Sequence, residues 1–247
     1  MRSLILLCLL CSTSAKPEDL SGKSMTFLDL NRAEDDHTHV ILPMAKRVDS
    51  ATLCLRYLMD RIRESLMFSI SHSDPSHSGV YLEKSYDEDE RERELAVFQL
   101  FVNGTSQARF SFPGPQEKRT EWNSLCVSWD AQKGSAALYL NGVEKGSLKE
   151  TPAEPLSGPP GDGASPRVTL GRRYDAENAL WRDDDFDVEL KDVHVWDSVL
   201  SSAEIQKYID DKTGSATFTS GNVVNWKALN FEVKGKFLLL RELNKCE

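Results

Sequence analysis

The stretch that decides the fold is Ser124-Leu-Cys-Val-Ser-Trp129, together with its counterpart Thr52-Leu-Cys-Leu-Arg56 earlier in the chain. Each segment places one cysteine among apolar and β-favouring residues, which is typical of strands in the core of a sheet. We therefore expect the two segments to be neighbouring strands and Cys54 to form a disulfide bond with Cys126. Closing a loop of about seventy residues would remove roughly 4 kcal/mol of chain entropy from the unfolded state.

The first fifteen residues differ from the rest of the chain. Arg2 is followed by an apolar run at residues 4–10 and then by small residues up to Ala15. This pattern is typical of a signal peptide cleaved after Ala15, and a buried N-terminal helix is the alternative interpretation. The run is too short to anchor the chain in a bilayer, and no later segment has the length of a transmembrane helix. We expect a secreted, extracellular protein.

Three cysteines remain after cleavage, because Cys8 and Cys11 leave with the signal peptide. In an oxidising compartment two of the three should pair. If Cys54 pairs with Cys126, then Cys246 is left over. For Cys246 the sequence leaves open a bridge between two chains, a capped thiol, or a loose end without a role.

The composition is that of one globular domain, with 40% hydrophobic and 28% charged residues. The formal net charge of −9 disfavours nucleic acid and anionic membranes as partners, since like charges repel at long range. The chain is expected to divide into a signal peptide at residues 1–15, a leader at residues 16–24, one domain at residues 25–240 and a tail at residues 241–247.

Alternation of apolar and polar residues dominates the expected domain. Asn103-Gly104 and Asn141-Gly142 lie between pairs of apolar runs, which is a strong hairpin signal. Short strands separated by turns predict an all-β fold, with two antiparallel sheets packed as a sandwich. The expected strands are residues 25–30, 51–58, 66–71, 79–83, 95–102, 108–112, 124–129, 136–140, 167–171, 186–196, 223–229 and 236–240.

Three local features interrupt this pattern. Ser201-Ser-Ala-Glu204 has capping-box spacing, and apolar residues follow at helical spacing, so we expect one short helix that ends at Gly214. Acidic residues 86–94 and the Pro- and Gly-rich residues 149–165 are expected to be loops. Asn103-Gly-Thr105 is a glycosylation sequon in a predicted turn, so Asn103 is expected to carry a glycan; a plain turn asparagine is the alternative.

The residues around Cys126 resemble the signature of the pentraxin family. That signature runs His, any residue, Cys, any residue, Ser or Thr, Trp, any residue, Ser or Thr. Cys126, Ser128 and Trp129 match it, whereas its first and last residues are absent. Residues 192–201 resemble the family's Trp-Asp segment, and residues 222–235 resemble its C-terminal segment. The resemblance spans residues 25–240, and family members share a disulfide in the order of Cys54 and Cys126.

The resemblance implies a flattened jelly-roll sandwich, lectin-like in shape and usually assembled as a cyclic pentamer. It implies a binding protein of innate immunity and no enzyme. In the family, two calcium ions on one face of each subunit bridge to a ligand such as phosphocholine or a carbohydrate. Calcium takes six to eight oxygen ligands, mostly from carboxylates and carbonyls.

The calcium ligands that the family uses are only partly present. Its Glu-Gln-Asp run follows a Leu-Gly turn, here Leu170-Gly171, and Asp175 matches the last residue of that run. Arg173 stands where a bridging Glu is expected, which places a cation beside a dication. We expect weakened calcium binding, with loss of the metal as one interpretation and an altered site as the other.

The remaining metal and ligand positions also depart from the family. Ser76 and His77 stand at its Asp-Asn pair, and only Asp74 nearby could contribute a carboxylate. The later acid of the site would come from a shifted acidic group. That group consists of Asp183, Asp184 and Asp185. Leu82 and Gln107 stand where the family places an aromatic wall and a carboxylate for choline, so phosphocholine recognition of the usual kind is not expected.

Two other functions remain as alternatives. One is a structural oligomerisation module whose binding face is vestigial. The other is a glycan-cleaving enzyme, which needs two carboxylates at a set separation. Residues 87–94 and 183–187 are acidic enough to supply them, but neither stretch has the apolar alternation that would hold carboxylates rigidly.

Overall fold

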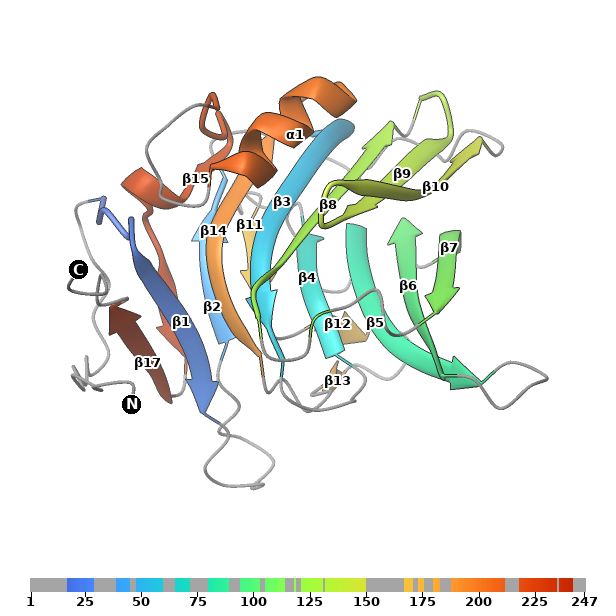
Figure 1. Cartoon of the computed structure of the whole chain (residues 1–247). Helices are drawn as coiled ribbons and strands as arrows, with labels where there is room; N and C mark the ends of the chain where they lie inside the picture. The colour runs from blue at the N-terminus through green and yellow to red at the C-terminus, as the bar shows by residue number, and fades with distance from the viewer. Residues whose placement is uncertain are drawn as a thin grey trace, which may run out of the picture.

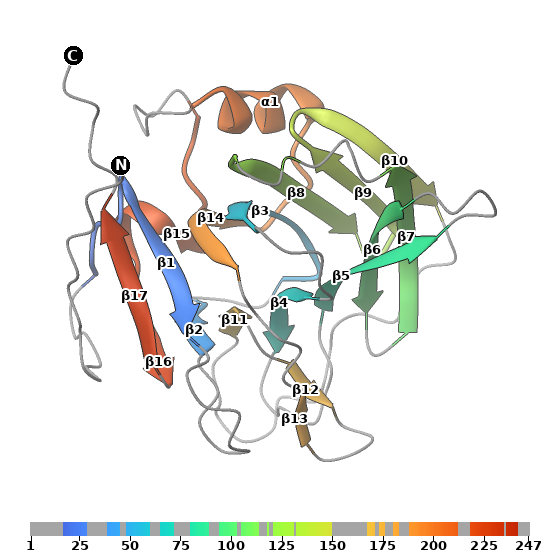
Figure 2. The ribbon, with the colours of Figure 1, turned by 60° about the horizontal axis from the view of Figure 1, so that its bottom comes forward.

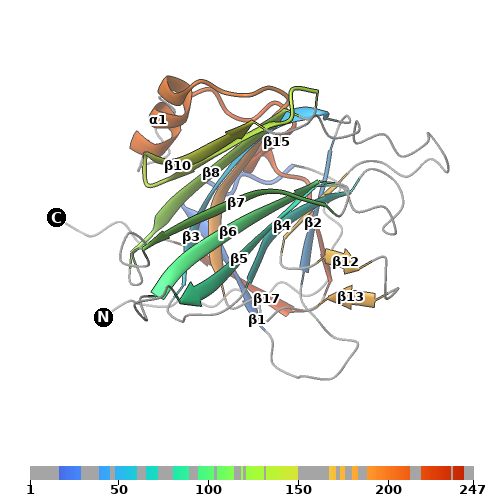
Figure 3. The same ribbon diagram turned by 90° about the vertical axis from the view of Figure 1, so that its right-hand side faces the viewer.

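The computed structural model consists of two antiparallel β-sheets packed face to face, with one α-helix on the outer face of the first sheet (Figure 1, Figure 3). It describes residues 17–28, 39–44, 48–59, 65–71, 80–88, 94–102, 105–113, 118, 121–130, 132–149, 167–170, 173–175, 180–182, 188–211, 218–234 and 236–241. None of the helices in these ranges is long and apolar enough to cross a membrane. The predicted two-sheet sandwich with one short helix is confirmed.

The first sheet has eight strands, the second has seven, and a separate hairpin has two. The first contains β1 (Lys23–Leu28), β3 (Ser50–Leu58), β8 (Asn123–Asp130), β9 (Ser135–Leu140), β10 (Val143–Lys149), β14 (Glu189–Trp196), β15 (Val224–Asn225) and β17 (Lys236–Arg241), in the order β10-β9-β8-β3-β14-β1-β17, with β15 paired to β14. The second contains β2 (His39–Pro43), β4 (Ser65–Ser71), β5 (Val80–Glu88), β6 (Glu94–Val102), β7 (Thr105–Pro113), β11 (Arg167–Leu170) and β16 (Glu232–Lys234), in the order β16-β2-β11-β4-β5-β6-β7. The hairpin contains β12 (Arg173–Asp175) and β13 (Leu180–Arg182).

β3 and β8 form the centre of the first sheet. They pair from Ser50 opposite Asp130 to Tyr57 opposite Asn123, and Cys54 lies directly opposite Cys126. The two cysteines form a disulfide bond, with their Cα atoms 4.1 Å apart. The predicted disulfide is confirmed.

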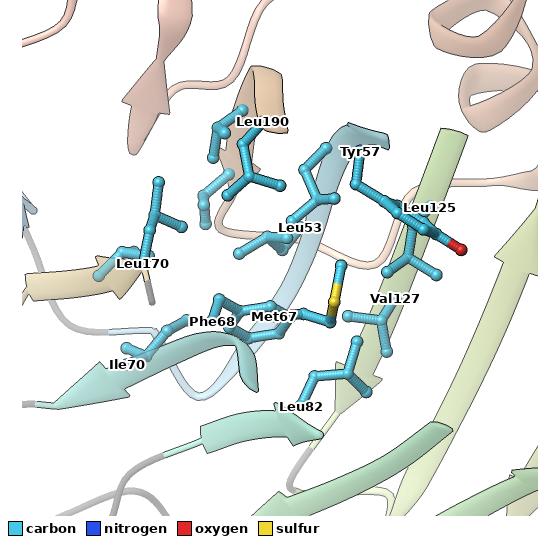
Figure 4. Close-up of a cluster of buried hydrophobic side chains, with 14 of the residues drawn as sticks. Leu53, Tyr57, Met67, Phe68, Ile70, Leu82, Leu125, Val127, Leu170 and Leu190 are labelled. Atoms are coloured by element: carbon cyan, nitrogen blue, oxygen red, sulfur yellow. The ribbon is translucent and has the colours of Figure 1, made fainter. Parts of the chain in front are cut away.

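The hydrophobic core fills the space between the two sheets. Leu53 of β3 and Val127 of β8 are fully buried there, and in Figure 4 they face Phe68 of β4 and Leu82 of β5 across the interface. Burying one such side chain stabilises the fold by about 1.5–3 kcal/mol. Because successive side chains of a strand point to opposite faces, Cys54 lies on the outer face of the first sheet.

Helix α1 (Ser202–Asp210) lies on the outer face of the first sheet (Figure 1). Its buried side chains pack in one cluster with Cys54 and Cys126. Ser201 and Glu204 form the expected capping box, and Ile205, Tyr208 and Ile209 are the buried residues of the helix. The helix ends at Asp210 rather than at Gly214. Sequence spacing locates a helix start well, but the end here depends on a residue far away in the chain.

That residue is Arg56 of β3, which is only 6% exposed. Its Nη2 donates hydrogen bonds to the carbonyl oxygens of Tyr208, at 2.9 Å, and of Asp211, at 2.8 Å. Its Nε lies 3.1 Å from a carboxylate oxygen of Asp192. The guanidinium therefore takes up the free carbonyls at the C-terminal end of α1, where a positive charge is also favoured by the helix dipole.

A β-bulge in β14 brings Asp192 to this position. The pairing of β14 with β3 shifts between Lys191 and His194, and Asp192 has a φ of 54°, in the left-handed region. Leu190 and Val193, three residues apart instead of two, both face the core. The extra residue lets the Asp192 carbonyl accept a hydrogen bond of 2.9 Å from the Tyr208 hydroxyl.

The interpretation of residues 86–94 as a loop is wrong at both ends. β5 continues to Glu88 and β6 begins at Glu94, and these two residues pair with each other. Backbone hydrogen bonds of the ladder do not depend on side-chain charge, so an acidic sequence can still extend a hairpin. The turn at Asn103-Gly104 and residues 150–165 lie outside the described residues, and β10 reaches Lys149.

The start of the described chain is attached to its C-terminal part. Glu18 and Leu229 exchange two backbone hydrogen bonds of 2.9 Å. The Leu20 side chain is fully buried, and the indole Nε1 of Trp226 donates to the Leu20 carbonyl oxygen at 2.8 Å. Part of the expected leader therefore packs against the sandwich.

His194 lies on β14 beneath α1 and is 1% exposed. Its Nδ1 accepts a hydrogen bond of 3.3 Å from the backbone N–H of Gly221. Gly221 has no space for a side chain, because a Cβ would lie 2.1 Å from the carbonyl oxygen of Val224. Burial, together with the positive charges of Lys227 and Arg56, lowers the pKa of His194 to about 3.

The shifted pKa of His194 predicts a pH dependence of stability. Between the ordinary pKa of 6.5 and the folded value of about 3, the unfolded chain binds a proton that the folded protein excludes. The free energy of unfolding should therefore fall by up to about 1.4 kcal/mol for each pH unit below 6.5. His194→Asn keeps a neutral acceptor for Gly221 but cannot take up the proton. In urea unfolding, the variant should lose about 3 kcal/mol less than the wild type between about pH 6.5 and about pH 4; equal losses would contradict this assignment.

Candidate functional site

The outer face of the second sheet carries a row of side chains across four neighbouring strands. Thr169 of β11 lies opposite Ser69 of β4, which lies opposite Tyr81 of β5, which in turn lies opposite Phe101 of β6. The rings of Tyr81 and Phe101 stack, with centroids 4.5 Å apart and planes at 10°. Phe101 is half-buried and Tyr81 is 7% exposed, so Phe101 presents more of its ring to solvent.

A second row, of polar residues, runs beside the aromatic pair. Glu83 of β5 lies opposite Gln99 of β6, which lies opposite Arg109 of β7. Arg109 is exposed and the other two are half-buried. Each of the three also makes interactions within the protein. Aromatic side chains beside a few polar groups are typical of ligand sites, and a guanidinium is suited to phosphoryl oxygens.

The β12–β13 hairpin lies beside β4, on the side of the molecule away from α1 (Figure 2). It comes after β11, which ends at Leu170, as expected for the segment that would hold calcium. Arg173 lies opposite Arg182, and Asp175 lies opposite Leu180, two positions further along β12. The hairpin therefore places Asp175 and the cationic residue Arg173 on one short strand.

The other predicted calcium residues are not brought together by the part of the chain that the structure describes. Those that fall outside it are Asp74, Ser76, His77, Asp183, Asp184 and Asp185. Within the described ranges, no three His, Cys, Asp or Glu side chains are grouped so that they could hold a metal ion. Asn103, the predicted glycan acceptor, also falls outside them.

The structure corrects the position given to Leu82. Its side chain is fully buried in the core, so it cannot wall a ligand pocket on the outer face. Tyr81, one residue earlier, belongs to the outer face because Val80 and Leu82 both point inward. The alternation of these three residues in the sequence was a signal that could have identified Tyr81. For Gln107 the structure describes the backbone, within β7.

The most strongly shifted titratable groups of the described chain lie elsewhere, between α1 and the first sheet. Burial raises the pKa of Tyr208, which is 1% exposed, and lowers that of His194. Proton transfer to a substrate requires contact with that substrate, and the helix covers both groups. Their shifted pKa values therefore reflect packing and do not mark a catalytic site.

Comparison with known proteins gives a consistent result. A family model described as the Pentaxin family matches residues 26–240. Human serum amyloid P-component (Homo sapiens) is 28% identical over 235 residues, covering 90% of this chain and 88% of that protein. C-reactive protein of Xenopus laevis is 25% identical over 202 residues, covering 81% of this chain and 76% of that protein.

A solved structure supports the same fold. The native heptameric SAP-like pentraxin from Limulus polyphemus superposes with a TM-score of 0.71 at 18% identity, over 91% of this chain and 97% of that chain. This likeness confirms the expected flattened jelly-roll sandwich. Since the family model covers most of the chain, the protein belongs to the pentaxin family, also written pentraxin.

Proposed function

We propose that the protein is a secreted recognition protein of innate immunity that binds surface phosphoryl or carbohydrate groups. The observation that carries this proposal is the family match over residues 26–240. Serum amyloid P-component and C-reactive protein are among the matched relatives. The proposal contains no catalytic step.

The ligand would bind on the outer face of the second sheet. The Phe101 ring offers an apolar surface to the carbon face of a sugar, and the exposed Arg109 offers a bidentate donor to a phosphoryl group. Both residues lie within the two rows that cross β5, β6 and β7. Phosphocholine of the usual kind is not the proposed ligand, because the uncharged Gln107 stands where the family places a carboxylate for choline.

Calcium would bind weakly, with Asp175, Asp74 and the acidic group at residues 183–185 as its ligands. Arg173 lies two positions from Asp175 on β12. A cationic residue on the same short strand opposes a dication and lowers its affinity. Calcium would therefore assist ligand binding, but it would not be the main link between the protein and the ligand.

The protein would act as a cyclic homo-oligomer, because several identical faces together bind a repetitive surface far more tightly than one face does. The Limulus relative is heptameric, whereas the sequence resemblance implies a pentamer. We therefore propose a closed ring of identical subunits and assign no particular number of subunits to it.

Calcium titration tests the role of Arg173. Isothermal titration of the mature protein should give a heat signal weaker than that of two well-formed sites. Arg173→Glu restores the expected carboxylate and should raise the affinity by about tenfold or more. Lys207→Glu, the same change of charge at an exposed position on α1, is the matched control. Tight binding of two ions per chain by the wild type, or equal gains in both variants, would contradict the role given to Arg173.

Retention on columns tests the ligand face. We expect Arg109→Gln to weaken retention on phosphoryl-substituted agarose by about tenfold, since it removes a charged hydrogen-bond donor. Phe101→Leu should weaken retention on plain agarose, because it removes the ring and keeps the apolar bulk. Lys207→Gln, an exposed cation on α1, is the control and should change neither. If the wild type and all variants form a stable ring but both resins retain them equally poorly, the alternative of a structural oligomerisation module is favoured.

A further inference from the structure

The Cys54–Cys126 disulfide is enclosed on the outer face of the first sheet. Both cysteines are 0% exposed, and they pack against Ile205 and Tyr208 of α1 and against Trp196. The main hydrophobic core lies on the other side of the same sheet. Helix α1 therefore forms the main part of the layer between the disulfide and solvent, and Tyr139, Trp196 and Phe218 complete that layer.

The two ends of α1 are attached to β3 on either side of Cys54. The Thr52 hydroxyl accepts a hydrogen bond of 2.9 Å from the Leu200 N–H, just before the helix, and donates one of 2.9 Å to the Ser198 carbonyl oxygen. Arg56 binds the carbonyls at the other end, including that of Asp211 at 2.8 Å. Thr52 and Arg56 are the residues two positions before and after Cys54, so the helix is attached across the disulfide.

Helix α1 is a small unit that packs outside the main hydrophobic core. It has nine residues, too few for a stable isolated helix, so it is helical because it is docked. Its three buried side chains, Ile205, Tyr208 and Ile209, contact the outer face of the first sheet and not the space between the sheets. Local opening of such a unit costs less free energy than global unfolding.

We propose that α1 is a removable lid that controls reduction of the Cys54–Cys126 disulfide. While α1 is docked, a thiol cannot reach either sulfur; when α1 lifts, the disulfide becomes reducible although both sheets remain folded. Any process that detaches α1 therefore exposes the covalent link between β3 and β8 to reductants. This proposal does not depend on the ligand or on calcium.

The reaction is an ordinary thiol–disulfide exchange with a small dithiol. One thiolate of the dithiol attacks the sulfur of Cys54 or Cys126, the S–S bond breaks, and the other cysteine leaves as a thiolate that takes a proton from water. The second thiol of the reagent, as its thiolate, then displaces the first cysteine and closes a cyclic disulfide. Two electrons pass from the dithiol to the protein, and the rate depends on access to the attacked sulfur.

The test compares native-state reduction in two variants of the mature protein. Dithiothreitol is the probe, and the gain of two alkylated cysteines by mass spectrometry is the readout. Ile205→Ala weakens the docking of α1, and Leu100→Ala leaves a similar hole in the core of the second sheet. In the absence of denaturant, Ile205→Ala should speed reduction by about tenfold or more, and Leu100→Ala by less than about twofold.

Two further measurements keep the result decisive. Ile205→Val is the second variant, for the case in which Ile205→Ala does not fold. It removes one methyl group and should speed reduction by about two- to tenfold. In low urea, the logarithm of the wild-type reduction rate should rise with urea concentration. Its slope should be much shallower than the urea dependence of global unfolding, because lifting α1 exposes little surface. If both core and helix variants speed reduction in proportion to their loss of global stability, or if neither Ile205 variant changes the rate, the lid does not exist.

Discussion

The pairing of β3 with β8 is the contact on which the rest of the structure depends. It runs over eight residue pairs and holds Cys54 opposite Cys126. Its inner side supplies residues such as Leu53 and Val127 to the core, and its outer side carries the disulfide on which α1 packs. Arg56, on the same strand, then joins three elements, because its guanidinium meets Asp192 of β14, Ser124 of β8 and the last carbonyls of α1. The desolvation cost of this buried cation is offset by these charged and polar partners.

The framework and the proposed ligand face lie on opposite outer surfaces of the sandwich. The disulfide and α1 lie outside the first sheet, whereas Phe101, Arg109 and the β12–β13 hairpin belong to the second sheet or lie beside it (Figure 3). Substitutions on one surface are therefore separated from the other by the whole core, and energetic effects of such distant sites usually add independently. This arrangement explains how the family's sandwich can be kept while residues of the proposed ligand face change.

Much of the fold could be predicted because its signals are local. Alternating apolar residues, the Ser201 to Glu204 capping box and two cysteines in strand-like surroundings all correspond to observed elements. What could not be predicted depends on contacts between distant residues. The end of α1 is set by Arg56, and the bulge at Asp192 breaks the alternation of β14 with no turn residue to mark it. The candidate site was harder to predict from the sequence. The family pattern places Leu82 at the ligand site, whereas the alternation of side chains along β5 turns Leu82 into the core.

Non-reducing peptide mapping of the purified protein tests the central claim most directly. The account predicts one cross-linked pair of peptides, which contains Cys54 and Cys126 and separates into its two parts after reduction. It also predicts that this pair forms in nearly every molecule, because the two strands hold the sulfurs within bonding distance in the folded protein. Recovery of either cysteine as a free thiol, or of Cys54 joined to Cys246, would contradict the central pairing.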